Sequence, residues 1–184
     1  MISCNNKRIP AAENTSSVEI TETAAFFPVT SYLKGQIAEI KNNGLNPVRI
    51  RTAAGKTDSA WLKVEQLDSV FAEFLTPEID SVTMAGLFKE SKFHDQTLNS
   101  FTFTYEPLKA LPPGMLLKRW DVYVNPQNGT VKRIYMEKST ADKKELQLSW
   151  QSGIGSKITW FSTGASGNQE IEKEELVKWS FDEE

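Results

Sequence analysis

Hydrophobic residues recur every three or four positions in two segments of the first half of the chain. This is the period of a helix that buries one face. The segments 28–42 and 65–75 are therefore predicted to be helices, and a short third helix is predicted after Pro77. The apolar positions of these helices, all expected in the core, are Val29, Leu33, Ile37, Ile40, Leu67, Val70, Phe71, Phe74, Ile79, Val82 and Leu87.

The period changes to two from about residue 88 onward, where apolar and polar residues alternate. Alternation of this kind is typical of a strand with one buried face. It recurs in about six segments joined by short turns, so an antiparallel meander is predicted for this part of the chain. A separate β-hairpin is predicted for residues 48–64, with its turn at Ala54-Gly55.

These elements predict an α+β fold, in which two or three helices pack on one face of a curved, largely antiparallel sheet of about seven or eight strands. Residues 1–24 are rich in Ser, Thr, Asn and Ala and predict a flexible polar tether. Residues 25–184 predict a single α+β domain. The chain has 39% hydrophobic residues and one cysteine, which excludes a disulfide-stabilised scaffold.

Charge is distributed unevenly along the chain, whose net charge is −3. Residues 165–184 carry seven acids and two bases, whereas residues 109–144 carry eight bases and three acids. The basic segment has none of the arginine-rich runs or aromatic–basic interleaving of nucleic-acid readers. We interpret its cations as the solvent-facing side of hairpin strands and predict no nucleic-acid partner.

The single cysteine stands near the beginning of the sequence, in Met1-Ile2-Ser3-Cys4. A large apolar residue precedes it by three positions and a small residue directly, which resembles the end of a bacterial lipoprotein signal peptide. The resemblance implies that Cys4 is acylated and becomes the first residue of the mature protein. Two or three acyl chains would anchor it stably in a membrane. The expected location is the bacterial cell envelope, at the periplasm-facing side of the outer membrane.

A second, local resemblance lies in the stretch from Arg119 to Val131, which contains Asn125-Pro126 and Asn128-Gly129. An aromatic-rich strand, a turn with Pro and Gly and a return strand that starts with Val resemble the hairpin of PepSY-type envelope domains. From Phe26 onward the chain also resembles uncharacterised lipoproteins of Gram-negative envelopes. Both resemblances imply a location and no activity.

The residues for catalysis are sparse. The one histidine, His94, lies beside Asp95, but the Gly-x-Ser-x-Gly motif of a nucleophile elbow is absent from the sequence. A zinc site is not expected, because His94 and Cys4 are the only residues of their types and stand 90 positions apart. We therefore predict no catalytic residue, no metal and no cofactor.

Aromatic and charged residues give the only candidates for binding. Trp61 alternates against apolar neighbours, and Tyr123 shares a strand face with Arg119. Trp61, Arg119 and Tyr123 are therefore candidate ligand contacts, although tryptophans that simply line a sheet remain the alternative. The predicted function is a non-enzymatic, lipid-anchored envelope protein that presents a sheet face to a protein or glycan. A small periplasmic hydrolase or another enzyme with an unrecognised site, and an intracellular domain in which Cys4 is a free thiol, stay open.

Overall fold

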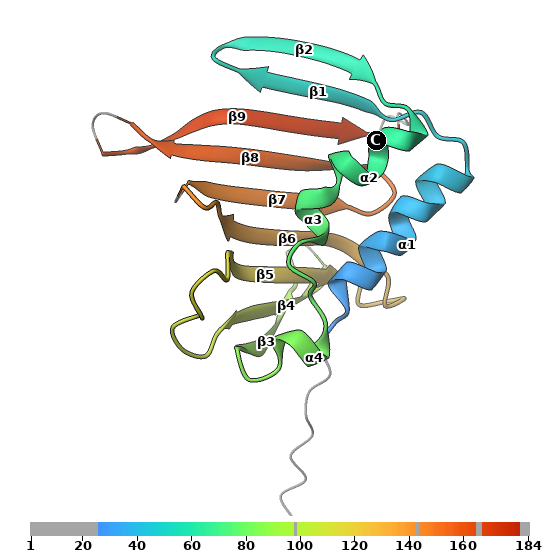
Figure 1. Ribbon diagram of the computed structural model, residues 1–184. Helices are drawn as coiled ribbons and strands as arrows, with labels where there is room; N and C mark the ends of the chain where they lie inside the picture. Colours follow the sequence, from blue (N-terminus) through green and yellow to red (C-terminus); the bar gives the residue numbers. More distant parts are fainter. Residues whose placement is uncertain (1–25, 98, 143, 165–166, 181–184) are drawn as a thin grey trace, which may run out of the picture.

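One antiparallel sheet of nine strands dominates the computed structural model, which describes residues 26–97, 99–142, 144–164 and 167–180 (Figure 1). The strand order is β2-β1-β9-β8-β7-β6-β5-β4-β3. Strands β3 to β9 form a meander in which each strand pairs with the next, and the β1–β2 hairpin joins the sheet beside β9. The bounds are β1 Val48–Ala53, β2 Lys56–Trp61, β3 Phe88–Asp95, β4 Ser100–Pro107, β5 Leu117–Val124, β6 Val131–Ser139, β7 Glu145–Gln151, β8 Gly155–Thr163 and β9 Gln169–Lys178.

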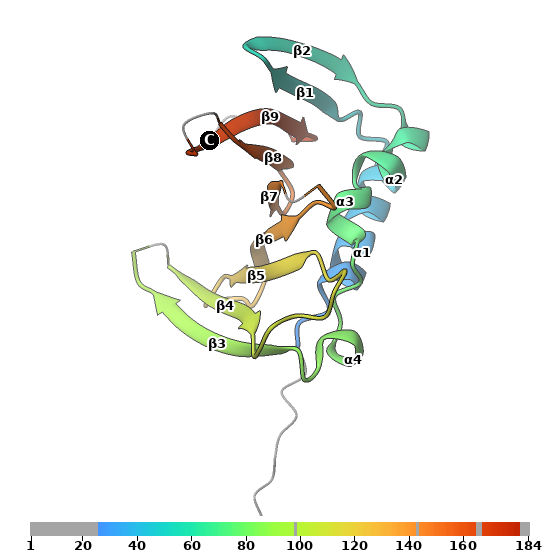
Figure 2. The same ribbon diagram turned by 60° about the vertical axis from the view of Figure 1, so that its left-hand side comes forward.

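The helical segments lie along one side of this sheet (Figure 2). Only α1 is longer than four residues among those that the structure describes. The bounds are α1 Val29–Asn42, the 3-10 turn η1 Val64–Gln66, α2 Leu67–Val70, α3 Ala72–Leu75 and α4 Ser81–Met84. In the first helix, Val29, Leu33, Ile37 and Ile40 are buried, as the helical spacing predicts.

The predicted fold class is wrong. The described chain is mostly β, with nine strands instead of seven or eight, and its helices are too few and short for the α+β arrangement with two or three helices on the sheet. The expected helix 65–75 is broken at Phe71, where φ −94° and ψ 5° end α2. The inward position assigned to Val82 is also wrong, since this side chain is 88% exposed.

Two differences from the predicted strands, the additional strand β3 and the greater length of β9, have a physical explanation. β3 is an edge strand whose middle and end are largely exposed, so it lacks the alternation that marks a half-buried strand. The first part of β9, from Gln169, is likewise exposed and rich in Glu, and its alternation becomes visible only near Val177. The β1–β2 hairpin forms as predicted, but every residue of β2 is exposed.

Large aromatic side chains connect the sheet to the helical segments. Phe71 and Phe74 contact Trp150 edge-on, with ring centroids 5.0 and 5.5 Å away. Tyr105 stacks on Trp120 at 4.6 Å. The tryptophans on β5 and β7 thus belong to the core, as the alternative interpretation of the aromatic residues proposed.

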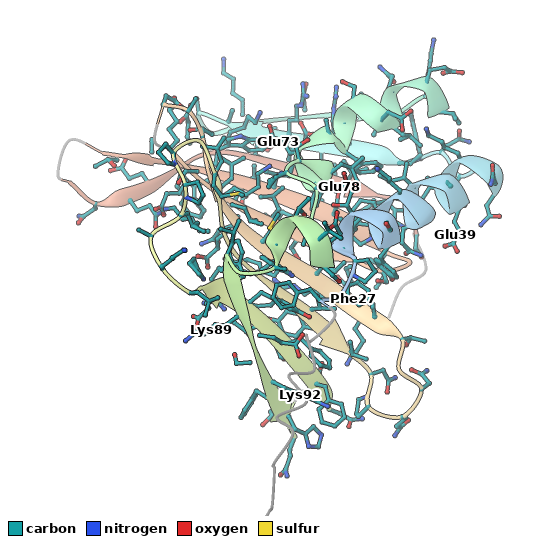
Figure 3. The ribbon with its side chains drawn as sticks, turned by 60° about the horizontal axis from the view of Figure 1, so that its bottom comes forward. Phe27, Glu39, Glu73, Glu78, Lys89 and Lys92 are labelled. Atoms are coloured by element: carbon teal, nitrogen blue, oxygen red, sulfur yellow. The ribbon has the colours of Figure 1, made fainter. Side chains whose placement is uncertain are left out.

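A buried lysine provides a polar link across the same layer. The Lys138 side chain on β6 is only 4% exposed. Its Nζ donates to the backbone oxygens of Glu73 and Thr76 at 2.7 and 2.6 Å, and to Glu73 Oε2 at 2.8 Å. Glu73 lies among the helical segments, which Figure 3 shows over the strands. The lysine therefore uses all three of its protons to hold α3 and the segment after it against the sheet.

Candidate functional site

Charged and aromatic side chains gather on β5 and β6, on the side of the sheet opposite the helical segments. Trp120 and Val122 of β5 face the core, so the alternating residues point the other way. The register places these residues opposite partners on β6, in the pairs Arg119–Glu137, Asp121–Tyr135 and Tyr123–Arg133. We call these six residues the β5–β6 cluster.

The centre of the cluster is an ion pair that is mostly buried. Arg119 Nη2 donates to Asp121 Oδ1 and Oδ2 at 3.1 and 2.9 Å. The Asp121 side chain is only 5% exposed, although it lies on the face that no described helix covers. Burial by itself would lower the pKa of Arg119, but the neighbouring Asp121 carboxylate, helped by Glu137 and Glu106, raises it. Arg119 is thus charge-compensated within the sheet.

Two tyrosines frame this ion pair. The Tyr135 hydroxyl donates to Glu137 Oε1 at 3.1 Å. Burial and then the Glu137 carboxylate raise the pKa of Tyr135, and burial and then Asp121 raise the pKa of Tyr123. Both phenols therefore stay protonated at neutral pH and act as hydrogen-bond donors.

Among the residues that the structure describes, Arg133 differs from Arg119 in having no acidic partner. Its Nε donates to Ser149 Oγ at 2.9 Å. Its guanidinium carbon lies 5.6 Å from the ring centroids of both Tyr123 and Tyr135. Within the described residues, no carboxylate lies within 4.0 Å of this guanidinium. Arg133 is therefore held in place by neutral groups, and its charge is not paired with a carboxylate of the described residues.

A small hollow lies beside Arg133. Its volume is about 260 Å³, and it lies between β5, β6 and β7. The described residues that line it carry cationic, hydroxyl and amide groups, and none of them is acidic. They are Ser100, Tyr123, Lys132, Arg133, Ser149 and Gln151.

The structure brings two of the three predicted contacts together. Arg119 and Tyr123 both belong to the β5–β6 cluster, whereas Trp61 lies at the β2 edge and is 66% exposed. Trp61 occupies the same cross-strand row and face as Tyr123, through Val48, Lys178, Gly155, Gln151 and Arg133. Six strand spacings separate the two, roughly 29 Å at 4.8 Å each. Trp61 and Tyr123 therefore do not form one small site.

Sequence reasoning missed the β6 half of the cluster. Arg133, Tyr135 and Glu137 alternate with the buried Ile134 and Met136. That alternation is readable in the sequence and would have placed all three on one face. Their proximity to Arg119 and Tyr123 depends on the β5–β6 register, which contains two irregularities.

The other candidates gain less from the structure. Cys4 and the tether 1–24 lie outside the described residues. His94 lies on β3, with its ring 4.5 Å from that of Phe101. The described residues contain no group of three or more His, Cys, Asp and Glu side chains that could hold a metal ion.

A larger groove of about 570 Å³ lies between α3, the β4–β5 loop and the β6–β7 turn. Much of its wall is apolar, with Pro77, Pro112, Pro113 and Met115 among its residues. Lys138 also reaches it, but the lysine's protons are already bound by Glu73 and Thr76. The groove therefore offers shape without a free polar anchor at this lysine.

Comparison with known proteins gives no relative. No family model matches the sequence, and searches of curated proteins and of solved structures find no match. Among the described residues, no helix is long and apolar enough to cross a membrane.

Proposed function

We propose that this protein is a non-enzymatic, lipid-anchored protein of the bacterial cell envelope that binds a protein or glycan partner through the helix-free sheet face. The β5–β6 cluster is the observation that carries the proposal. The lipobox-like Met1-Ile2-Ser3-Cys4 supports the anchor and the location.

The chemistry of the cluster favours recognition. A sheet face that only meets solvent does not require a carboxylate buried to 5% exposure, because burying a charge is costly unless it is paired. Here Arg119 offsets this cost, and Tyr135 lies opposite Asp121 in the register, with its hydroxyl bound by Glu137. Aromatic rings beside fixed polar groups are common at binding surfaces, since they offer large contact area with little loss of side-chain entropy.

The binding part of the proposal is tested with variants of this face. Tyr123→Ala and Arg133→Ala together remove one ring and the uncompensated cation, and Arg49→Ala removes a cation from the opposite face of the sheet. The full chain and both variants are immobilised and exposed to solubilised envelope proteins and to a glycan array. We expect a specific protein or glycan that the cluster variant loses and the Arg49 variant keeps. Equal binding by all three forms would contradict the proposal.

The anchor is tested separately. The gene is expressed with its upstream sequence in a Gram-negative host, and the membrane-extracted protein is analysed by intact mass spectrometry. An acylated Cys4 at the amino terminus is expected, and Cys4→Ser should move the protein into the aqueous fraction. An unmodified thiol on the extracted protein would contradict lipid anchoring.

A further inference from the structure

We infer that the hollow beside Arg133 takes the anionic group, carboxylate or phosphate, of an acidic glycan. This inference rests on the proposed function and assigns a ligand class to one part of the same face. Three observations lead to it: the state of Arg133, the lining of the hollow, and the contrast with Arg119.

The first observation is that the guanidinium is oriented before any ligand arrives. Hydrogen bonding of Nε to Ser149 Oγ at 2.9 Å fixes one edge of the group. The rings of Tyr123 and Tyr135, each with its centroid 5.6 Å from the guanidinium carbon, restrict its remaining freedom. An arginine held in this way loses little side-chain entropy on binding, and its two terminal nitrogens match the two oxygens of a carboxylate or phosphate.

The second observation is the lining of the hollow. Lys132 lies beside Arg133, and the other groups are hydroxyls of Ser100, Tyr123 and Ser149 and the amide of Gln151. Because the described lining has no acidic side chain, an anion entering it meets attraction without a repelling carboxylate. Ser100 is buried and its hydroxyl donates to backbone oxygens, so the hydroxyls of Tyr123 and Ser149 and the amide of Gln151 are the groups that suit the hydroxyls of a sugar, which donate and accept hydrogen bonds. An anionic sugar is therefore the ligand that fits both halves of the lining.

The third observation is that Arg119 and Arg133 have different neighbours across the strands. Arg119 lies opposite Glu137 and binds Asp121, so its charge is compensated. Arg133 lies opposite Tyr123 on one side and Gln151 on the other. On this face, the Asp121–Tyr135 pair separates the Arg119–Glu137 pair from the Tyr123–Arg133 pair. The unpaired charge of Arg133 therefore lies at the hollow, and the attraction for an anion is confined to that end of the cluster.

The test uses two matched ligands and three variants of the full chain. The first ligand is a tetrasaccharide that contains glucuronate, and the second is the same tetrasaccharide with its carboxylates reduced to primary alcohols. Glucose 6-phosphate provides the phosphate arm. Binding is followed by amide chemical shifts of the ¹⁵N-labelled protein. Arg133→Gln removes the charge, Arg133→Lys keeps the charge without the planar fork, and Arg49→Gln is the control with the same change of net charge on the other face.

The acidic tetrasaccharide or glucose 6-phosphate should shift the amides of Tyr123, Arg133 and Ser149. Arg133→Gln should weaken this binding by about tenfold or more, the usual size for a charge-assisted bidentate contact. Arg133→Lys should weaken it by about threefold, and Arg49→Gln by less than about twofold because its charge lies across the sheet. Reduction of the carboxylates should cost about as much as Arg133→Gln. Whichever anionic sugar binds more tightly identifies the group as carboxylate or phosphate.

Several results would overturn the inference. Equal affinity for the acidic and the reduced tetrasaccharide, together with no binding of glucose 6-phosphate, would do so, as would equal losses in the Arg133→Gln and Arg49→Gln variants. Absence of shifts with every anionic sugar would also overturn it. If the double variant Tyr123→Ala, Arg133→Ala nevertheless no longer binds a neutral glycan or a protein that the unaltered chain binds in the assay of the proposed function, that function stands and only the anion site fails. If it loses nothing there, both fail together.

Discussion

Replacing the buried Lys138 with methionine tests how firmly the helical segments are held on the sheet. Methionine has a similar length and no charge, so Lys138→Met preserves most of the packing around β6 and removes the three hydrogen bonds of Nζ. Two of the three acceptors are backbone oxygens, of Glu73 and Thr76. These oxygens lose their partner, and the apolar methionine cannot replace it.

The expected cost follows from these contacts. A backbone acceptor that loses its partner at a part-buried site costs about 1–3 kcal/mol, and the methionine side chain recovers part of this by burying its apolar atoms. The Glu73 carboxylate is 52% exposed and regains water, so its loss of the ammonium adds less than about 1 kcal/mol. Together these give a decrease in the free energy of unfolding of about 2–4 kcal/mol.

Urea unfolding followed by tryptophan fluorescence measures this decrease, because Trp150 and Trp179 lie in the core. Lys118→Met is the matched control. Lys118 is on the neighbouring strand and is 43% exposed in its pair with Glu145, so its loss should cost less than about 1 kcal/mol. A free energy of unfolding for Lys138→Met that lies within about 0.5 kcal/mol of the value for the unaltered protein, at an unchanged m value, would refute the reasoning.

Three further predictions follow from single features of the fold. All four tyrosines have a pKa raised chiefly by burial, so absorbance at 295 nm should show no phenolate step near pH 10. Because folding favours the neutral phenols, their contribution to stability is fully present below pH ~10 and falls as the pH rises toward the folded-state pKa values. A normal phenolate step near pH 10 in the folded protein would contradict this. Asp121→Asn should lower the free energy of unfolding by about 1.5–3 kcal/mol, because the charge pairing with Arg119 is lost. In a double-mutant cycle with Arg119→Gln, the coupling energy should exceed about 0.5 kcal/mol. Additive losses would show that the pair does not interact. A Cβ on Gly155 would lie 2.6 Å from the Val177 backbone oxygen, so Gly155→Ala should lower the free energy of unfolding, measured in urea, by about 1–3 kcal/mol. Gly35→Ala, in open space on α1, should raise it by about 0.5–1 kcal/mol. The opposite order would contradict the register of β8 and β9.

The parts of the fold that were predictable are those where burial is one-sided. The α1 positions Leu33 and Ile37 and the β7 positions Leu148 and Trp150 carry a clear period because one face meets the core and the other meets water. The edge strand β3 carries no such contrast, and neither does the first part of β9, which pairs with β8 but not with β1. The apolar pattern therefore did not reveal β3 and revealed only the end of β9. The break at Phe71 was hidden for another reason: Leu67 and Phe74 keep helical spacing across it, since both sides of the break face the same core. The missing periodicity of exposed strands and the hidden break at Phe71 together explain why the predicted number of strands and the predicted fold class were wrong.

The site was predictable only up to the choice of face. Alternation places Arg119 with Tyr123, and it would place Arg133 with Tyr135, but alternation treats the two arginines as equivalent. Their difference comes from what lies across the strands: Glu137 is opposite Arg119, whereas Tyr123 and Gln151 flank Arg133. Moving β6 by two residues along β5 would preserve every buried position and exchange these partners. The register therefore decides which cation is compensated and which is left to a ligand, and it is fixed by the turn at Asn125–Thr130 and by the irregularity between Tyr123 and Val124, which no periodicity of apolar residues reveals.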